Sequence, residues 1–327
     1  MNKVSGAYAP VWLTKLFGQV GARLIYFSWL AIKERPDVLV GFHLLVNGLF
    51  VVVLAKLIGA KSVYICGGGP REVNRGGIET ESRIFKRIGQ ADFFIEKMLI
   101  KAVNEMDLVV SMGASAITYF KEKGVDTTFE IVPGAFDNTI FAPDPDTEKI
   151  YDLVLIGRLS EIKRVDRFLK AIKETQKTLP RINAVIVGDG PDKEQLQDLA
   201  KELHIEDVIH FAGWQDNVHT WIQKSRCFVL TSDSEGLSQA LIQAMMCGLP
   251  AITSDVGDLG DLLLDGENGY LVSSLTALDF SMAFNELLSN PSKEIRFSNN
   301  AFESTLKFAP KIVEKHWGEI LFELSRA

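Results

Sequence analysis

Two cations, Arg158 and Lys163, follow an apolar run that ends at Gly157. Ser160, between them, is a suitable N-cap, so the pattern predicts a strand, a turn and a helix with Lys163 in its first turn. Cationic side chains beside the unpaired N–H groups of a helix start bind phosphate or diphosphate. Taken alone, the pair is also compatible with two solvated charges at a helix start.

A glycine-rich turn follows in Val187-Gly188-Asp189-Gly190-Pro191. Glycines at the end of a strand let the backbone approach a ligand closely, because they carry no Cβ atom. A tight turn without a ligand would use the same residues. The motif therefore supports a phosphate site only together with the others.

A carboxylate, Glu235, lies between a later apolar run and the helix after it. The N–H groups of Gly236, Leu237 and Ser238 are expected to point at an anion, with Gln243 further along the same helix. A carboxylate beside a phosphate site is useful when the ligand also carries hydroxyls or a developing positive charge, as a sugar attached to a diphosphate does. A plain helix cap is the alternative.

These motifs stand at the ends of apolar runs that alternate with helical patterns along the whole chain. Most runs are continuously apolar, as expected of parallel strands covered on both faces. The alternation predicts an α/β fold with parallel sheets. The predicted strands are 37–42, 62–66, 107–112, 129–132, 151–157, 182–188, 208–212, 227–231, 250–253 and 269–272.

The chain of 327 residues is long enough for about two domains. Two prolines among acidic residues in segment 141–147 predict a boundary near residue 145. We expect an N-terminal domain over 1–145, a C-terminal domain over 146–310, and a helix over 311–327 that could pack back on the N-terminal domain. Ligands of doubly wound sheets bind outside the strand carboxyl ends, so a cleft between the two domains is the expected site.

Four motifs in this order resemble the retaining nucleotide-sugar glycosyltransferases of family four, which have the GT-B fold of two Rossmann-like domains. The resemblance is dense from about 151 to 272 and looser upstream, at 35–40 and 132–137. It is carried by Gly157-Arg-Leu-x-x-x-Lys163-x-x-Asp166-x-x-Leu169, Val187-Gly-Asp-Gly-Pro191, Phe211-Ala-Gly-Trp214 and Ser234-Glu-Gly…Ala-Met-x-Cys-Gly-Leu-Pro250.

The resemblance implies a role for each motif. Arg158 and Lys163 would hold the donor diphosphate and stabilise the leaving group, and Glu235 would contact the transferred sugar. The donor-binding set would comprise Gly157, Gly188, Asp189, Gly190, Trp214 near the base, Gly236, Leu237, Ser238 and Gln243. The family usually uses UDP- or GDP-sugars without an essential metal, so no cofactor is expected.

Three positions depart from the family pattern. Gln243 stands where the family has a second glutamate, so contact with the ribose would lose its charge assistance. Only 36 residues precede Asp37, so compared with the family pattern we expect the first strands to be missing and the N-terminal domain to be incomplete. Gly67 and Gly68 occupy the place of a family histidine; they, with His43 after the preceding strand, are the candidates for the acceptor side, although a surface turn and a rim histidine are equally compatible.

Composition and charge exclude several other classes. Three cysteines are too few for a disulfide framework or a Cys-rich zinc site, and a reducing compartment is the simplest interpretation. The chain has 16 Lys and Arg against 13 Asp and Glu in 1–143, and 19 against 29 in 144–327, so no basic face accumulates for nucleic acid. The apolar, aromatic segment 11–32 is either a core helix or a helix that rests on a membrane or a partner.

The expected function is therefore transfer of a hexose-type sugar, with retention, from a UDP- or GDP-sugar to a hydroxyl of a glycan or lipid-linked saccharide. The expected location is cytoplasmic, with peripheral contact at the inner face of the membrane as an open possibility. A basic segment, Arg71, Arg75, Arg83, Lys86 and Arg87, could meet a phosphorylated lipid or be a solvated helix face. The alternatives are a non-catalytic nucleotide-sugar-binding subunit that needs a partner chain, and an epimerase on the same scaffold.

Overall fold

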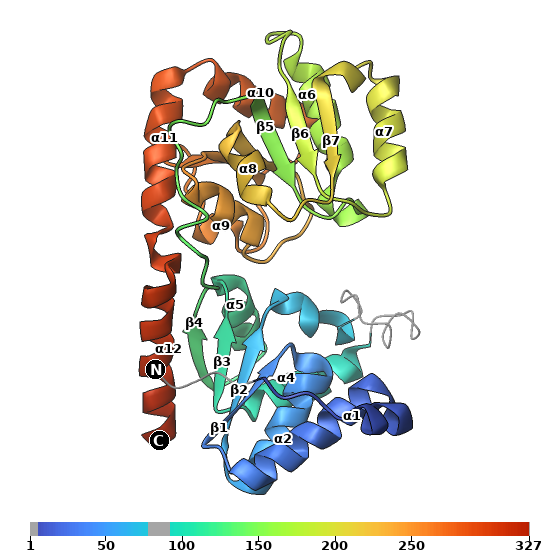
Figure 1. Ribbon diagram of the computed structural model, residues 1–327, viewed down its shortest axis with the longest axis vertical. Helices are drawn as coiled ribbons and strands as arrows, with labels where there is room; N and C mark the ends of the chain where they lie inside the picture. The colour runs from blue at the N-terminus through green and yellow to red at the C-terminus, as the bar shows by residue number, and fades with distance from the viewer. Residues whose placement is uncertain (1–5, 78–91, 327) are drawn as a thin grey trace. The chain divides into compact units, whose positions relative to one another are not determined.

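The computed structural model describes residues 6–77 and 92–326. Of the basic segment named above, Arg83, Lys86 and Arg87 therefore lie outside the described residues. The strands form a four-stranded and a six-stranded sheet, both parallel, with helices between successive strands (Figure 1). Every predicted strand is present, with ends that differ by about two residues at most. The predicted α/β fold with parallel sheets is confirmed.

Contacts divide the chain into two compact units. Unit 1 contains the described residues up to Val132 and those from His316 onward, and unit 2 contains Pro133–Lys315. The division falls before residue 145, where the sequence places the boundary. Helix α12, Pro310–Arg326, contributes residues to both units.

The sheet of unit 1 has its strands in chain order, β1-β2-β3-β4. Right-handed crossovers that all move in one direction place their helices on the same face of a sheet. The core on that face joins Val52, Tyr64, Leu99 and Phe120. The elements are β1 (Val38–Phe42), α2 (Leu49–Ile58), β2 (Lys61–Cys66), α4 (Phe93–Asn104), β3 (Leu108–Ser111), α5 (Ala114–Glu122) and β4 (Thr128–Ile131).

Helix α1, Val11–Glu34, is only partly buried. Leu13, Ala22 and Ala31 are its buried residues, and several of its large apolar side chains face solvent. Gly18 interrupts it with a φ of 68°, so it consists of two helical pieces joined at a kink. Among the residues that the structure covers, no helix has the length and hydropathy to cross a membrane.

The sheet of unit 2 has the order β10-β9-β8-β5-β6-β7. The chain runs outward from β5 through β6 to β7, then returns to the other side of β5 with β8. The strand order therefore reverses between β5 and β8, and this is the topological switch point of the sheet. The strands are β5 (Tyr151–Ile156), β6 (Ala184–Val187), β7 (Ile209–Gly213), β8 (Ser225–Leu230), β9 (Ala251–Ser254) and β10 (Gly269–Val272).

The apolar face of α6 anchors the core of unit 2. Phe168, Leu169 and Ile172 are buried, as the helical spacing predicts, and the ring of Phe168 meets that of Phe284 at 6.1 Å between centroids. Helix α9 ends at Met246, and Gly248 follows with a φ of 76° that favours glycine. The helices are α6 (Val165–Thr175), α7 (Lys193–Glu202), α8 (Val218–Gln223), α9 (Gln239–Met246), α10 (Ala277–Leu288) and α11 (Pro291–Ser304).

Candidate active site

The loops that follow β5 and β8 leave neighbouring strands at the switch point of unit 2. Val154 of β5 pairs with Phe228 of β8 in parallel register, so both strands end at the same edge of the sheet. Ligands of open α/β sheets bind outside this edge, where the two loops diverge. The three predicted catalytic residues, Arg158, Lys163 and Glu235, lie on these two loops.

Lys163 and Glu235 contact each other across the two loops. The Lys163 Nζ atom lies 2.5 Å from Glu235 Oε1, with 23% and 9% of the respective side chains exposed. The Ser232 hydroxyl also donates to Glu235 Oε1 at 2.5 Å. A cation and a carboxylate that are both largely shielded from water thus meet at the strand ends, where the sequence places the donor.

The start of the helix after β5 differs from the prediction. Glu161–Lys163 form a single 3-10 turn, and α6 begins only at Val165, so Lys163 does not lie in its first turn. The Ser160 side chain forms no cap hydrogen bond. Arg164 separates the turn from the helix, because its φ of 48° is left-handed. That conformation accompanies the bonds of Arg164 to two carboxylates.

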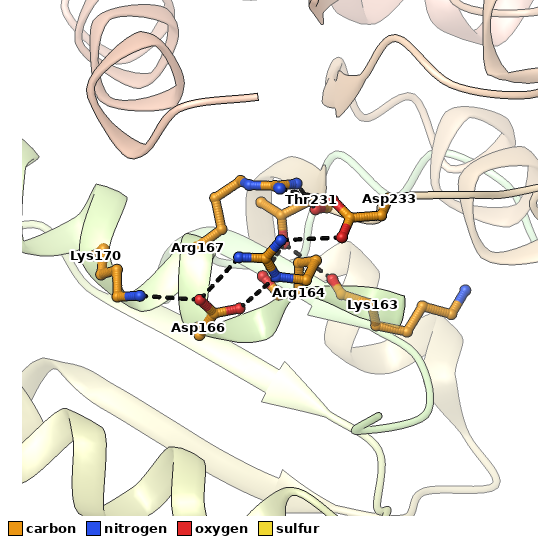
Figure 2. Close-up of polar contacts among 7 residues, drawn as sticks. All are labelled: Lys163, Arg164, Asp166, Arg167, Lys170, Thr231 and Asp233. Atoms are coloured by element: carbon orange, nitrogen blue, oxygen red, sulfur yellow. Dashed lines mark hydrogen bonds and ion pairs between the residues drawn. The ribbon is translucent and has the colours of Figure 1, made fainter. Parts of the chain in front are cut away.

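Arg164 and Arg167 hold Asp233 at the start of the second loop (Figure 2). Arg164 Nη1 donates to Asp233 Oδ2 at 3.0 Å, and Arg167 Nη2 donates to Asp233 Oδ1 at 2.7 Å. Arg167 is buried and also donates to the Thr231 carbonyl at 2.5 Å. Arg164 Nε bonds to Asp166 Oδ1 at 3.0 Å, so one guanidinium bridges two carboxylates.

These bonds shift the pKa values of the acids. Burial raises the pKa of Asp166, but hydrogen bonds from Arg164 and Lys170 outweigh burial and bring the pKa to about 2. Burial likewise raises the pKa of Asp233, and bonds from Arg167 and Arg164 outweigh it, so the net pKa is lowered. Both acids are therefore ionised at neutral pH, so their hydrogen bonds with the arginines are charge-assisted.

Thr231 ties the backbones of the two loops together. Its hydroxyl is 2.9 Å from the Arg164 carbonyl and 3.2 Å from the Lys163 carbonyl. The Asp233 N–H donates to the Ile162 carbonyl at 2.9 Å. In Figure 2 the Lys163 side chain points away from the arginine cluster, toward the other side of its loop. The arginine cluster positions the loop after β5, and the Lys163 amine pairs with Glu235.

The glycines of the second motif pack on the first motif. A Cβ atom on Gly188 would lie 1.9 Å from the Gly157 carbonyl oxygen, and one on Gly190 would lie 2.1 Å from that of Leu159. The Leu159 N–H donates to the Asp189 carbonyl at 2.9 Å. Close backbone approach is thus required, as the sequence suggests, and here the partner is the neighbouring loop.

The loop from Glu235 into α9 presents donors at the same edge. None of the hydrogen bonds described for the chain uses the N–H of Gly236, Leu237 or Ser238. The Ser238 hydroxyl caps α9 by accepting from the Leu241 N–H at 3.4 Å. Gly257, on the loop after β9, packs against the Glu235 backbone, because a Cβ there would lie 1.8 Å from the Glu235 carbonyl oxygen.

For the other residues predicted to bind the donor, the structure gives their exposure and local contacts. Arg158 is exposed on the loop after β5. Trp214 follows β7, is 75% exposed and donates to Asp216 at 3.1 Å. Asp189 pairs with Lys193, whose hydrogen bond lowers the pKa of Asp189. Gln243 is half-buried on α9. Their roles stay predictions.

In unit 1 the predicted acceptor residues surround a buried carboxylate that the sequence did not single out. His43 follows β1, with 54% of its side chain exposed, and its Nδ1 lies 2.8 Å from Oε1 of Glu72, which is 5% exposed. Glu72 also accepts from the N–H groups of Leu44 at 2.7 Å and Gly68 at 2.6 Å, and from the Tyr64 hydroxyl at 2.9 Å.

Gly67 and Gly68 make room for this pair. A Cβ on Gly67 would lie 3.2 Å from His43 Cε1, and one on Gly68 would lie 2.9 Å from Glu72 Cγ. The hydrogen bond to Glu72 raises the pKa of His43. Burial raises the pKa of Glu72, but bonds from His43, Leu44 and Gly68 outweigh it, and the net pKa is lowered. An oriented imidazole therefore stands at the carboxyl ends of β1 and β2.

The sequence motifs did not single out several residues that position the site, namely Glu72, Arg164, Arg167, Ser232, Asp233 and Gly257. The only signal for the arginines was their place directly after the Arg158–Lys163 motif. Among the described residues, no group of three or more His, Cys, Asp or Glu side chains is arranged to hold a metal ion.

Comparison with known proteins places this site in a family. Residues 137–304 match the family model described as glycosyl transferases group 1, and the chain belongs to that family. The chain is 25% identical over 301 residues to the amylovoran biosynthesis glycosyltransferase AmsD of Erwinia amylovora, which covers 91% of this chain and 81% of that protein. It is 36% identical over 128 residues to N-acetyl-alpha-D-glucosaminyl L-malate synthase of Bacillus anthracis, with 38% and 32% covered.

A solved structure supports the fold. The crystal structure of Anabaena Alr3699/HepE in complex with UDP superposes with a TM-score of 0.75 at 17% identity, and covers 94% of this chain and 84% of that one. The GT-B fold implied by the sequence motifs is therefore confirmed.

Proposed function

We propose that this group 1 glycosyltransferase is a retaining hexosyltransferase, as in family four, that moves a sugar from a UDP- or GDP-sugar to a hydroxyl of a glycan or lipid-linked saccharide. The observation that carries the proposal is the meeting of Lys163 with Glu235 beside the three N–H groups of 236–238. This edge offers a cation and backbone donors for a diphosphate, together with a carboxylate for a sugar.

The donor would change the charge balance of this pair. Without a ligand, Lys163 neutralises Glu235 at 2.5 Å. A diphosphate would bring new negative charge to the amine and to the N-terminus of α9, and Arg158 would add a second cation from the same loop. Glu235 would then accept hydrogen bonds from hydroxyls of the transferred sugar. These cations supply the positive charge, so the proposal includes no metal or other cofactor.

The proposed reaction is a front-side displacement. The acceptor hydroxyl attacks the anomeric carbon from the leaving-group face, its oxygen forms the new glycosidic bond, and the bond from that carbon to the diphosphate oxygen breaks. The departing phosphate takes the hydroxyl proton. Lys163 and Arg158 stabilise the negative charge that accumulates on the leaving group, and Glu235 stabilises the positive charge on the sugar.

The acceptor would bind unit 1 at the carboxyl ends of β1 and β2, where His43 is held by Glu72 above Gly67 and Gly68. An imidazole with one nitrogen fixed by a buried carboxylate presents the other nitrogen in a defined direction. Relatives named for polysaccharide synthesis, such as AmsD, and a structural neighbour solved with UDP favour this donor and acceptor class. A cytoplasmic location is part of the proposal.

A screen of nucleotide sugars tests the proposed donor and reaction. A true donor at about 100 times its dissociation constant should add about 2.7 kcal/mol to stability in a thermal-shift assay. Transfer would then be assayed with that donor and a panel of saccharide and lipid-linked acceptors, and NMR of the product would report the anomeric configuration. An inverted product would contradict retention, and donor binding without hydrolysis or transfer would favour a non-catalytic binding subunit.

A further inference from the structure

Helix α1 of unit 1 presents an exposed apolar stripe that the donor site does not use. Ile25, Trp29 and Ile32 are 42%, 51% and 60% exposed, and their spacing of four and three residues places them on one side of the helix. The Tyr26 ring stacks on Trp29 with 5.6 Å between centroids, and Lys33 Nζ lies 5.2 Å from the Trp29 ring centre. The stripe thus combines aromatic rings with a cation.

The opposite side of α1 is already anchored. Phe27 and Ala31 pack with Val51, Leu54 and Ala55 of α2 in one apolar cluster. The helix therefore has two apolar sides, of which one holds it to its unit and the other faces solvent. Contiguous exposed apolar surface of this kind marks a site of interaction rather than a folding requirement.

Helix α4 of the same unit also carries exposed apolar side chains together with lysines. On α4, Phe93, Phe94 and Met98 are exposed together with Lys97 and Lys101. Lys56 of α2 pairs with Glu105, the residue that follows α4. Exposed apolar side chains on α2 are Val53 and Leu57.

These three helices carry a net positive charge. They carry six lysines and arginines and two glutamates, namely Lys15, Arg23, Lys33, Lys56, Lys97, Lys101, Glu34 and Glu96. Glu96 is buried and pairs with Lys123 at 2.6 Å, and Glu34 pairs with Lys33 at 3.0 Å. These helices therefore expose apolar and aromatic side chains together with a net positive charge.

We infer that the exposed stripe of α1 docks on the headgroup region of a bilayer that contains anionic lipids. Trp and Tyr rings favour the boundary between headgroups and acyl chains, and lysine and arginine beside them are attracted to anionic lipid. A second copy of the chain fits this surface less well, because two faces of the same positive charge would repel.

Co-sedimentation of the full chain with vesicles tests the inference. Vesicles of phosphatidylcholine alone are compared with vesicles that are about one third phosphatidylglycerol, at low and high salt. We expect binding to the anionic vesicles that weakens with salt, and little binding to the neutral ones. Absence of binding to the anionic vesicles would overturn the inference, and a dimer by light scattering with no vesicle binding would assign the stripe to self-association.

Variants locate the contact. Ile25→Gln, Trp29→Gln and Ile32→Gln together should abolish vesicle binding, while Leu278→Gln with Met282→Gln, at exposed positions of α10, should leave it unchanged. Lys15→Gln should weaken binding by about fivefold. Circular dichroism checks that each variant is folded. If the triple variant binds like the wild type, α1 is not the docking surface, whatever the donor assays show.

Discussion

Lys163 and Glu235 are far apart in the sequence, yet their charged groups lie 2.5 Å apart because β5 and β8 are neighbours in the sheet. The contact is located at the one place in unit 2 where the strand order reverses. Behind it, Arg164, Arg167 and Asp233 join the same two loops. The geometry of the candidate site thus depends on these charged contacts, which lie on the other side of the loop from the Lys163 amine.

The loss of stability on removing the Asp166 carboxylate should depend on pH in a defined window. The pKa of Asp166 is about 2 in the folded protein, against about 3.9 in an unfolded chain. Because the folded pKa is the lower one, the stabilisation is present above pH 4 and is lost as the pH falls toward 2. Asp166→Asn should lower the free energy of unfolding by up to about 2 kcal/mol at pH 7.

Urea denaturation at pH 7, 4 and 3 checks this prediction. The difference between Asp166→Asn and the wild type should shrink as the pH falls. Asp198→Asn serves as the control, because its ion pair with Lys201 is exposed and contributes little. A difference that stays constant with pH would show that the ionised Asp166 carboxylate does not contribute to the free energy of unfolding.

Gly257→Ala should disrupt the loop that carries Glu235. The new Cβ would lie 1.8 Å from the Glu235 carbonyl oxygen, so one of the two loops must move. We expect a loss of stability of roughly 2 kcal/mol or more, together with weaker nucleotide binding. Gly266→Ala is the matched control, because Gly266 also has a positive φ of 73° but no atom within 4 Å of its Cβ position. Equal thermal shifts for the two variants would mean that only backbone strain matters.

Glu72→Gln should destabilise unit 1. Each carboxylate oxygen of Glu72 accepts two hydrogen bonds, and an amide nitrogen cannot accept any. We expect a cost of about 1–3 kcal/mol, because buried donors would lose their acceptor. Tyr64→Phe, which removes one of the four donors, should cost less. Hydrogen exchange of unit 1 peptides measures both, and unchanged protection in Glu72→Gln would contradict the assigned network.

The strands were predictable because continuous apolar runs are a local signal, and all ten fall where those runs lie. The start of α6 was not, because Arg164 adopts a left-handed conformation that accompanies bonds to Asp166 and Asp233. Asp233 is 69 residues from Arg164, and only the order of the strands brings them together. The exposure of α1 was also undetermined, because apolar residues on both sides of a helix do not show which side is covered.

The same limit applies to Gly188 and Gly190. Their spacing indicates close backbone approach, but a sequence does not say whether a ligand or another loop approaches. In the structure the partners are the carbonyls of Gly157 and Leu159. The glycines therefore allow the loop after β6 to pack closely on the loop after β5, and their contact with a nucleotide stays a prediction.

Calorimetric titration of UDP and GDP into the wild type, Lys163→Ala and Lys170→Ala tests the central claim most directly. We predict that one nucleotide binds the wild type, that Lys163→Ala weakens this binding about tenfold or more through loss of a charged hydrogen bond, and that Lys170→Ala leaves it unchanged. Equal affinity for Lys163→Ala and the wild type, or no binding of either nucleotide, would contradict the assignment of the diphosphate to this edge of the sheet.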